Sequence, residues 1–376
     1  MLEAREARHA VIYRDQYAYC AHAHAAVASD GTWLVVFNCA LRRPFVLHPP
    51  EDPLFRNMLT RSRDRGATWS VPQVVPNYER SGTECAGLTV LGDGTIMLNQ
   101  WCFDWYPLDL ARRLPDQSYL SYPSSFIKGW LASPEHDTSP FADRVPEAIA
   151  PWARGSGKTL IHLSKDHGAS FTKTVAIDTA PFSGGYGMRS AAELANGTLI
   201  LLLSDVPNYR QVFAIRSGDG GLSWSKPNLV AAGPGHEFEE PAIICCRSGK
   251  LLAILRDNAR RHLHQVESAD GGLTWTSPRQ LDIRGYPGHL LGLDDGRLLL
   301  TYGWRQPDFG VRAVISPDEG RSWQTSETIR IRGGLPNKNL GYPATIAAGE
   351  GRYLTVYYGE DETGCTCIMA TYWSLP

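Results

Sequence analysis

The apolar residues of this chain recur in a pattern that appears six times, a turn glycine followed by a short apolar run. Glycine adopts the backbone angles that a tight turn requires, and an apolar run bounded by turn residues is typical of a β-strand. We therefore predict six hairpins, each joining one strand to the next. Their turn glycines are Gly31, Gly94, Gly197, Gly249, Gly296 and Gly351.

A second motif, S-x-D-x-G-x-[ST]-[WF], follows five of these hairpins. Its aspartate can accept backbone N–H groups in a tight turn, and its aromatic ring can anchor that turn against neighbouring strands. We therefore assign the motif aspartates a structural role rather than a catalytic one. The copies are Ser62–Trp69, Ser164–Phe171, Ser217–Trp224, Ser268–Trp275 and Ser316–Trp323.

This motif is the Asp-box, and the chain resembles the sialidase (neuraminidase) superfamily of β-propellers over nearly its whole length. The last four box aspartates are roughly 50 residues apart, the length of one propeller blade. Six hairpins and five boxes predict an all-β, six-bladed propeller that forms a single domain over residues 1–376. We expect the last blade to take up the N-terminal strand around Ala10–Tyr13, which closes the ring and removes exposed sheet edges.

The first interval between boxes is about twice as long as the others, which places an insertion at residues 103–156 within the second blade. The insertion is rich in aromatic residues and proline. A long loop in a compact domain is usually functional, so it could wall a central pocket and stack on sugars. The alternative is a surface subdomain that packs on itself, and both remain open.

Composition excludes several classes of function. A net charge of −2 and a pI near 6.6 argue against general binding to nucleic acid or to membrane surfaces. The chain has no apolar run long enough to span a bilayer, and residues 1–13 lack the apolar core of a signal peptide. We expect a cytoplasmic protein, or an exported one whose signal peptide has been removed. The sequence gives no indication of oligomeric state.

Polar residues are predicted to gather at one end of the propeller axis. Nine residues before each hairpin glycine lies the start of an innermost strand, and seven residues after it lies the end of the second strand. These ends lie side by side in an antiparallel hairpin, and bulges shift the register by one residue. Six polar residues should therefore converge on one central mouth. They are His22, Glu84, Arg189, Glu240, Arg256 and Tyr342.

The residue types in this set indicate a chemistry. Arginine presents a planar fork suited to a carboxylate. Tyrosine is a poor nucleophile at neutral pH unless a base takes its proton, and Glu240 is the candidate base. Sialidases are similar, with a glutamate about sixteen residues before an arginine and a nucleophilic tyrosine that opens the innermost strand of the last blade. The resemblance thus implies Glu240, Arg256 and Tyr342, together with a further arginine, either Arg305 or Arg312.

The chain also departs from the family pattern. Sialidases begin the first blade with Arg-Ile-Pro, whose arginine helps to bind the substrate carboxylate, whereas this chain has His22 and His24 in the segment Cys20–Ala25. These histidines are two apart on a strand, so both should face one side and act in the site. We expect no metal there, because no third ligand has a plausible spacing, and no other cofactor. The family's acid/base aspartate lies in the following loop, where Asp52 is the candidate by position.

Three functions fit these residues. The first is a sialidase-like, retaining exo-glycosidase that acts on a terminal carboxylate-bearing sugar of an acidic glycan or glycoconjugate. The second is a polysaccharide lyase or rhamnosidase-type enzyme acting on uronate-containing glycans, in which His22 or His24 would remove a proton and Tyr342 would act as acid. The third is a carbohydrate-binding propeller without turnover.

Overall fold

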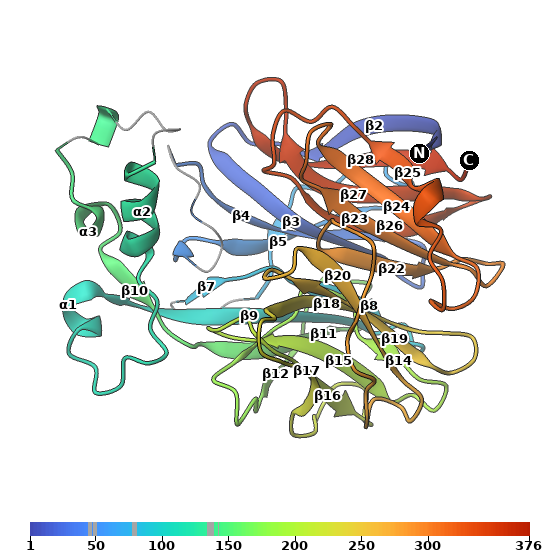
Figure 1. Ribbon diagram of the computed structural model, residues 1–376, viewed down its shortest axis with the longest axis horizontal. Coiled ribbons are helices and arrows are strands. Elements are labelled where there is room, and N and C mark those ends of the chain that lie inside the picture. The colour runs from blue at the N-terminus through green and yellow to red at the C-terminus, as the bar shows by residue number, and fades with distance from the viewer. Residues whose placement is uncertain (44–46, 48–50, 77–80, 134–138, 142) are drawn as a thin grey trace.

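The computed structural model describes residues 1–376 except 44–46, 48–50, 77–80, 134–138 and 142. The described strands form six sheets (Figure 1), and their innermost strands contact one another in sequence around a closed ring. The last sheet also contacts the first, through β26 and β3. The chain is therefore a six-bladed β-propeller, which confirms the predicted fold.

The first three blades each contain a central run of antiparallel strands. Blade 1 contains β3 (Ala18–Val27), β4 (Trp33–Leu41), β5 (Arg56–Ser62) and β6 (Gln73–Val74). Blade 2 contains β7 (Ser81–Thr83), β8 (Gly87–Val90), β9 (Ile96–Pro107), β10 (Trp152–Arg154), β11 (Lys158–Ser164) and β12 (Lys173–Ile177). Blade 3 contains β13 (Gly185–Tyr186), β14 (Ala192–Glu193), β15 (Leu199–Asp205), β16 (Val212–Ser217) and β17 (Asn228–Ala231).

The last three blades repeat this plan. Blade 4 contains β18 (Phe238–Cys245), β19 (Leu251–Asp257), β20 (His262–Ser268) and β21 (Arg279–Gln280). Blade 5 contains β22 (Gly288–Gly292), β23 (Leu298–Trp304), β24 (Gly310–Ser316), β25 (Ile329–Arg332) and β1 (Leu2–Glu3), with a 3-10 turn at Thr325–Glu327. Blade 6 contains β26 (Gly341–Gly349), β27 (Arg352–Glu360), β28 (Thr366–Ser374) and β2 (Arg5–Tyr13).

The N-terminal segment closes the ring as predicted. Strand β2 pairs antiparallel with β28, with Ala10 opposite Ala370 and Val11 opposite Met369. The sequence did not reveal that β1 pairs parallel with β25, which adds a fifth strand to blade 5. The first residues of the chain therefore join blades 5 and 6.

The core explains why the central strands read as unbroken apolar runs. In β19, Leu251 and Ala253 pack into the cluster shared with blade 3, whereas Leu252 and Ile254 pack into the cluster shared with blade 5. Side chains alternate between the two faces of a strand, and both faces of each blade are buried against a neighbour. Both sets of positions therefore have to be apolar.

The Asp-boxes form the turns after the third strand of blades 1 to 5. In the first box, Asp64 Oδ1 accepts the N–H of Thr68 at 2.9 Å and the hydroxyl of Ser62 at 2.7 Å, and Oδ2 accepts the Thr68 hydroxyl at 2.6 Å. These bonds lower the pKa of Asp64 to about 2. By strand direction, these turns lie on the face opposite the mouth, together with the hairpin glycines.

The insertion in blade 2 extends from one side of the propeller (Figure 1). Strand β9 continues to Pro107, where β10 pairs with it, and short helices lie between these two strands. Several apolar side chains of this segment, among them Ile127, Trp130 and Trp152, cluster with Leu47 of the loop that follows β4. Its helices are α1 (Leu108–Ala111), α2 (Pro123–Leu131), the 3-10 turn Ser139–Phe141 and α3 (Pro146–Ile149). Among the described helices, none has the length and apolar character needed to cross a bilayer.

Candidate active site

Three innermost strands carry the same β-bulge near the mouth. The register of β3, β18 and β26 slips at His22, Glu240 and Tyr342, whose φ angles are +55°, +50° and +52°. In β18 and β26 the next residue is proline, which has no N–H for the ladder and occurs at bulges. A left-handed conformation costs a non-glycine residue about 1–3 kcal/mol, and a bulge re-aims a side chain. In each of these three blades, the bulge therefore takes one polar side chain out of the regular alternation between the two faces of the strand.

Tyr342, Glu240 and Arg256 form a buried hydrogen-bonded group. The Tyr342 hydroxyl donates to Glu240 Oε1, and Arg256 Nη1 donates to Glu240 Oε2 at 2.7 Å and lies 3.4 Å from the Tyr342 oxygen. Burial raises the pKa of Tyr342 well above its usual value, and the charge of Glu240 adds to this. Burial also acts to raise the pKa of Glu240, but the Arg256 charge and the Tyr342 hydrogen bond outweigh it and lower that pKa. At neutral pH the ionised carboxylate of Glu240 therefore accepts a hydrogen bond from the neutral phenol of Tyr342.

The opposite edge of Arg256 is held by Asn258 and Glu239. Arg256 Nε lies 2.7 Å from Asn258 Oδ1 and 3.2 Å from Glu239 Oε1, and the Asn258 amide donates to the same Glu239 oxygen. Burial raises the pKa of Glu239 to about 7, although the Arg256 charge opposes this. The guanidinium lies 4.5 Å from the Tyr286 ring centroid. Within the described part of the chain, Arg256 Nη2 has no hydrogen-bond partner.

The structure places Arg305, and not Arg312, beside Tyr342. Arg305 Nε donates to the carbonyl of Leu340 at 2.9 Å, Nη2 donates to the Tyr358 hydroxyl at 3.2 Å, and the guanidinium carbon is 5.7 Å from the Tyr342 ring centroid. Arg312 instead packs 3.7 Å above the Trp304 ring. Of the two arginines that the sequence left open, Arg305 is therefore the one that lies beside Tyr342.

Glu84 enters the mouth from the break between β7 and β8. The Tyr209 hydroxyl donates to Glu84 Oε2 at 2.7 Å, and Arg154 Nη1 lies 3.4 Å from the Tyr209 oxygen. Burial raises the pKa of Glu84 to about 8, against the smaller opposing effects of Tyr209 and Arg154. Because Arg154 belongs to β10, the insertion supplies a charged group to this side of the site.

The two predicted histidines have different neighbours. The His22 ring meets the Tyr342 ring edge-on, with centroids 4.2 Å apart, and lies 5.0 Å from the Tyr358 ring centroid. His24 lies 5.5 Å from His289 by ring centroids and accepts a backbone N–H through Nδ1. Both imidazoles are buried, but only the first contacts the tyrosine of the candidate site.

Asp52 is held in an ion pair. Its Oδ2 accepts Arg43 Nε at 2.6 Å, and its Oδ1 accepts Arg43 Nη2 at 3.3 Å and the backbone N–H of Leu54 at 2.9 Å. The carboxyl is buried, and the structure shows no contact between it and Tyr342 or Glu240 among the described residues. Arg189, the remaining predicted residue, is buried in the segment between β13 and β14.

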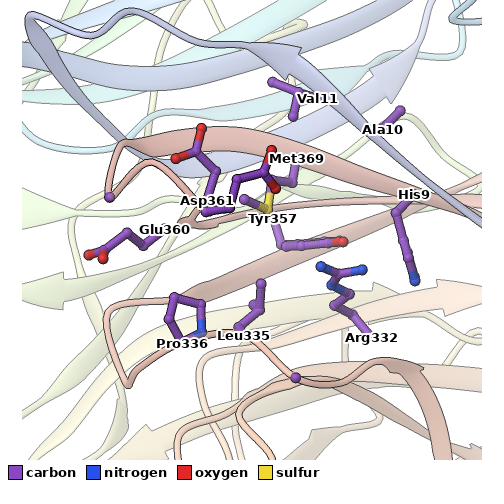
Figure 2. A pocket seen from close by; sticks show the side chains of 13 residues that line it. His9, Ala10, Val11, Arg332, Leu335, Pro336, Tyr357, Glu360, Asp361 and Met369 are labelled. Atoms are coloured by element: carbon purple, nitrogen blue, oxygen red, sulfur yellow. The ribbon is translucent and has the colours of Figure 1, made fainter.

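Two cavities differ in whether they adjoin the group formed by Tyr342, Glu240 and Arg256. A cavity of about 140 Å³ lies beside Arg305 and Tyr286 and is also lined by Arg261 and Arg284. A larger cavity of about 690 Å³ lies between the outer strands of blades 5 and 6, where Arg332 is one of its lining residues (Figure 2). None of the Tyr342 group lines the larger cavity. The arginine-lined cavity therefore adjoins the candidate chemistry.

One cluster has the composition of a metal site. His236, Asp257 and His264 present ligand atoms within 4.8 Å of one another. His236 Nδ1 lies 2.6 Å from Asp257 Oδ2 and His264 Nδ1 lies 3.7 Å from it, while Oδ1 accepts the N–H groups of Glu237 and Ala259 at 3.1 Å. Both imidazoles thus face a carboxylate that already fixes the turn after β19. Sequence analysis did not identify this cluster.

Sequence analysis also missed several residues of the mouth. Tyr358 lies seven residues after Gly351, the same count that selected Arg256, so the signal was present. Glu239 directly precedes a predicted residue, and a one-residue register shift would have included it. Arg154 and Tyr209 come from the insertion and from a loop, where the hairpin count gives no signal.

Comparison with known proteins identifies the family. Residues 145–356 match the model of the BNR repeat-like domain. The chain is similar to a protein of unknown function from Dyadobacter fermentans, with 23% identity, a TM-score of 0.82 and coverage of 98% of this chain and 99% of that one.

Two sialidase structures are more distant. The NanB sialidase from Streptococcus pneumoniae has 13% identity and a TM-score of 0.69, covering 97% and 70% of the two chains. The intramolecular trans-sialidase from Ruminococcus gnavus has 12% identity and a TM-score of 0.66, covering 95% and 94%. No curated protein sequence matches the chain. The chain therefore belongs to the BNR repeat-like domain family and has the fold of a six-bladed β-propeller.

Proposed function

We propose that this protein is a retaining exo-glycosidase that releases a terminal, carboxylate-bearing sugar, with Tyr342 as its nucleophile. The observation that carries the proposal is the hydrogen bond from the Tyr342 hydroxyl to Glu240, in a centre that also holds Arg256 and Arg305. A nucleophile paired with a base, which is in turn oriented by a third group, is the arrangement that covalent catalysis requires.

The reaction follows from this arrangement. The Tyr342 oxygen attacks the anomeric carbon and its proton passes to Glu240 Oε1, while the glycosidic bond breaks and the leaving oxygen takes a proton from a general acid. Water then attacks the anomeric carbon and gives a proton to the deprotonated acid, while Glu240 returns its proton to the tyrosine oxygen as the glycosyl–tyrosine bond breaks. This restores the phenol, Glu240 and the acid, and it retains the anomeric configuration. A neutral phenol suits an anionic sugar, because a carboxylate nucleophile would repel the substrate's own carboxylate.

Arginines favour an acidic substrate. Arg256 Nη2 and Arg305 Nη1 have no hydrogen-bond partner in the described ranges. Each charge-assisted bond from them to a substrate carboxylate is worth about 1.5–3 kcal/mol. The adjoining cavity adds Arg261 and Arg284. The site therefore offers an excess of positive charge where a terminal acidic sugar would enter.

Glu84 is the favoured general acid. Its pKa of about 8 leaves it protonated at neutral pH, as a proton donor must be. Asp52, the candidate by sequence position, has both carboxyl oxygens engaged by Arg43. Because Glu84 holds a proton and the Asp52 carboxylate is paired with Arg43, we assign the role of general acid to Glu84.

Trapping of the covalent intermediate tests the proposal. A fluorinated acidic glycosyl fluoride, which slows hydrolysis of the glycosyl–enzyme, should label Tyr342, and peptide mass spectrometry would locate the label. Tyr342→Phe should lose turnover by about 10⁴-fold or more on aryl glycosides of acidic sugars, while retaining ligand binding. Tyr357→Phe makes the same chemical change at a buried tyrosine of blade 6 that bonds Thr371, and it should keep full activity. Normal turnover by Tyr342→Phe would refute the proposal.

A lyase is the second candidate, favoured by the edge-on contact of His22 with Tyr342. There His22 would remove the C5 proton of a uronic acid, and Tyr342 would protonate the departing oxygen as a C4–C5 double bond forms. Such a product absorbs ultraviolet light, whereas hydrolysis releases a saturated sugar. Assaying sialosides beside uronate polysaccharides separates the two reactions.

A further inference from the structure

Three hydrogen-bond donors approach the propeller axis from alternate blades. His24 lies on β3 of blade 1, Arg189 lies between β13 and β14 of blade 3, and His289 lies on β22 of blade 5. Alternate blades of a six-bladed ring are about one third of a turn apart, so these side chains surround the axis. All three are buried, with 1%, 2% and 7% of their surfaces exposed.

The three groups are close to one another, and the two histidines lie further along their strands than the bulge residues His22 and Tyr342. The rings of His24 and His289 are 5.5 Å apart by centroids, and the charge of Arg189 acts on both imidazoles. His289 accepts the N–H of Thr345, which lies three residues further along β26 than Tyr342. His24 and His289 therefore lie apart from Arg256 and Arg305, which adjoin Tyr342 at the mouth.

Backbone hydrogen bonds fix the tautomer of both histidines. Leu88 N–H donates to His24 Nδ1 at 3.1 Å, and Thr345 N–H donates to His289 Nδ1 at 3.3 Å. A ring nitrogen that accepts a hydrogen bond carries no proton, so in the neutral imidazole the proton lies on Nε2. Burial, together with the Arg189 charge, lowers the pKa of each histidine well below its usual value and keeps it neutral. Each Nε2 is therefore a donor.

These donors lack acceptors within the protein. Among the described residues, none accepts a hydrogen bond from Arg189 Nε, Nη1 or Nη2, or from His24 Nε2. Burial lowers the pKa of Arg189 to about 10, which still leaves the guanidinium charged at neutral pH. Glu240 acts on this charge from a distance, but its oxygens accept from Tyr342 and Arg256. Buried donors in native structures have partners, so the cluster requires an acceptor from outside the chain.

We propose that a small monovalent anion of the halide class binds on the propeller axis between Arg189, His24 and His289. A metal ion does not fit, because the Nε2 atoms carry protons and the guanidinium would repel a cation. Water could accept two of the hydrogen bonds but would bring no charge to offset Arg189. The site is separate from catalysis, and the proposal stands whether or not Tyr342 acts as a nucleophile.

Bromide serves as the probe for this site. Crystals of the full chain soaked in sodium bromide should give an anomalous peak between the three side chains. In solution, protein transferred to sodium gluconate should show a saturable rise in its unfolding temperature when chloride or bromide replaces gluconate at constant ionic strength, since a ligand that binds only the folded state stabilises it. Absence of both the peak and the halide-specific rise would overturn the proposal and leave water as the occupant.

A substitution tests whether the halide binds at these three side chains. His289→Phe keeps the ring but removes its donor, and it should raise the half-saturating bromide concentration at least tenfold. His162→Phe makes the same change at a buried histidine of blade 2 that bonds Gln100 and Thr174, and it should leave the halide response unaltered. An unaltered response in His289→Phe would place the halide elsewhere and refute the site. If that variant does not fold, the bromide peak in the unmodified chain decides the question.

Discussion

The buried carboxyl of Glu84 gives the sharpest prediction, because it makes stability depend on pH. Its pKa is about 8 in the folded protein against an ordinary value of 4.5, chiefly because of burial. Between these values the folded chain holds a proton at Glu84 that the unfolded chain has released. The unfolded state therefore binds fewer protons, and the free energy of unfolding falls as pH rises through this window.

The size of the effect follows from the same two values. A rise from 4.5 to about 8, at about 1.36 kcal/mol per pH unit, corresponds to about 5 kcal/mol between pH 4.5 and pH values above 8. Glu84→Gln keeps the shape of the side chain and an oxygen that can accept the Tyr209 hydroxyl, but it does not titrate. Because the unfolded carboxyl is already mostly ionised at pH 5, the variant should gain about 4 kcal/mol relative to the unmodified protein between pH 5 and pH 9.

Equilibrium unfolding in urea at pH 5, 6, 7, 8 and 9 measures this difference, with fluorescence and circular dichroism as coincident probes. Glu147→Gln, at an exposed position of α3, is the matched control and should follow the unmodified protein at every pH. Parallel curves for Glu84→Gln and the unmodified protein would mean that Glu84 ionises alike in the folded and unfolded states, which would refute the reasoning.

Three further predictions concern the site and the repeat. Arg305→Lys should weaken binding of an acidic sugar by about 10–100-fold in calorimetry, because one planar charge-assisted contact is lost, whereas Arg312→Lys should bind normally; equal affinities would contradict the placement of Arg305. Asp166→Ala removes the acceptor for the Ser170 N–H and hydroxyl, so it should lower the unfolding temperature by about 2 °C without changing ligand affinity, and a loss of binding would contradict a purely structural Asp-box. Glu84→Gln should slow glycosides with poor leaving groups at least 100-fold more than those with good ones, and equal slowing would argue against its role as acid.

Counting from the hairpin glycines located the central group because every blade repeats one geometry. The glycines take the positive φ angles that their turns require, and the strand ends on either side of each turn are neighbours. Glu240 and Arg256, on one hairpin, and the distant Tyr342 were therefore predictable as a set. Their contact in the structure follows from the repeat and not from any local signal around each residue.

The positions of the remaining residues of the mouth depend on local strand pairing and side-chain contacts, which the repeat does not determine. Arg154 arrives through pairing of β10 with the extended end of β9, inside an insertion that has no counterpart in the other blades. Arg305 directly follows β23 and Arg312 is near the start of β24, and only packing shows that Arg312 stacks on Trp304. Asp52 lies in the expected loop, but its carboxylate forms an ion pair with Arg43. Each outcome is decided by a single side-chain contact, which spacing along the chain cannot reveal.

Strained backbone positions in three innermost strands place polar side chains in the candidate site. A regular innermost strand directs its side chains alternately toward the two neighbouring blades, which suits an apolar core. At His22, Glu240 and Tyr342 the strand bulges and the backbone adopts a left-handed conformation instead. Each such residue costs about 1–3 kcal/mol and persists only where the surroundings over-determine it, as the apolar clusters between adjacent blades do here. The stability of the interblade core therefore holds three polar side chains in positions that an unstrained propeller would not give them.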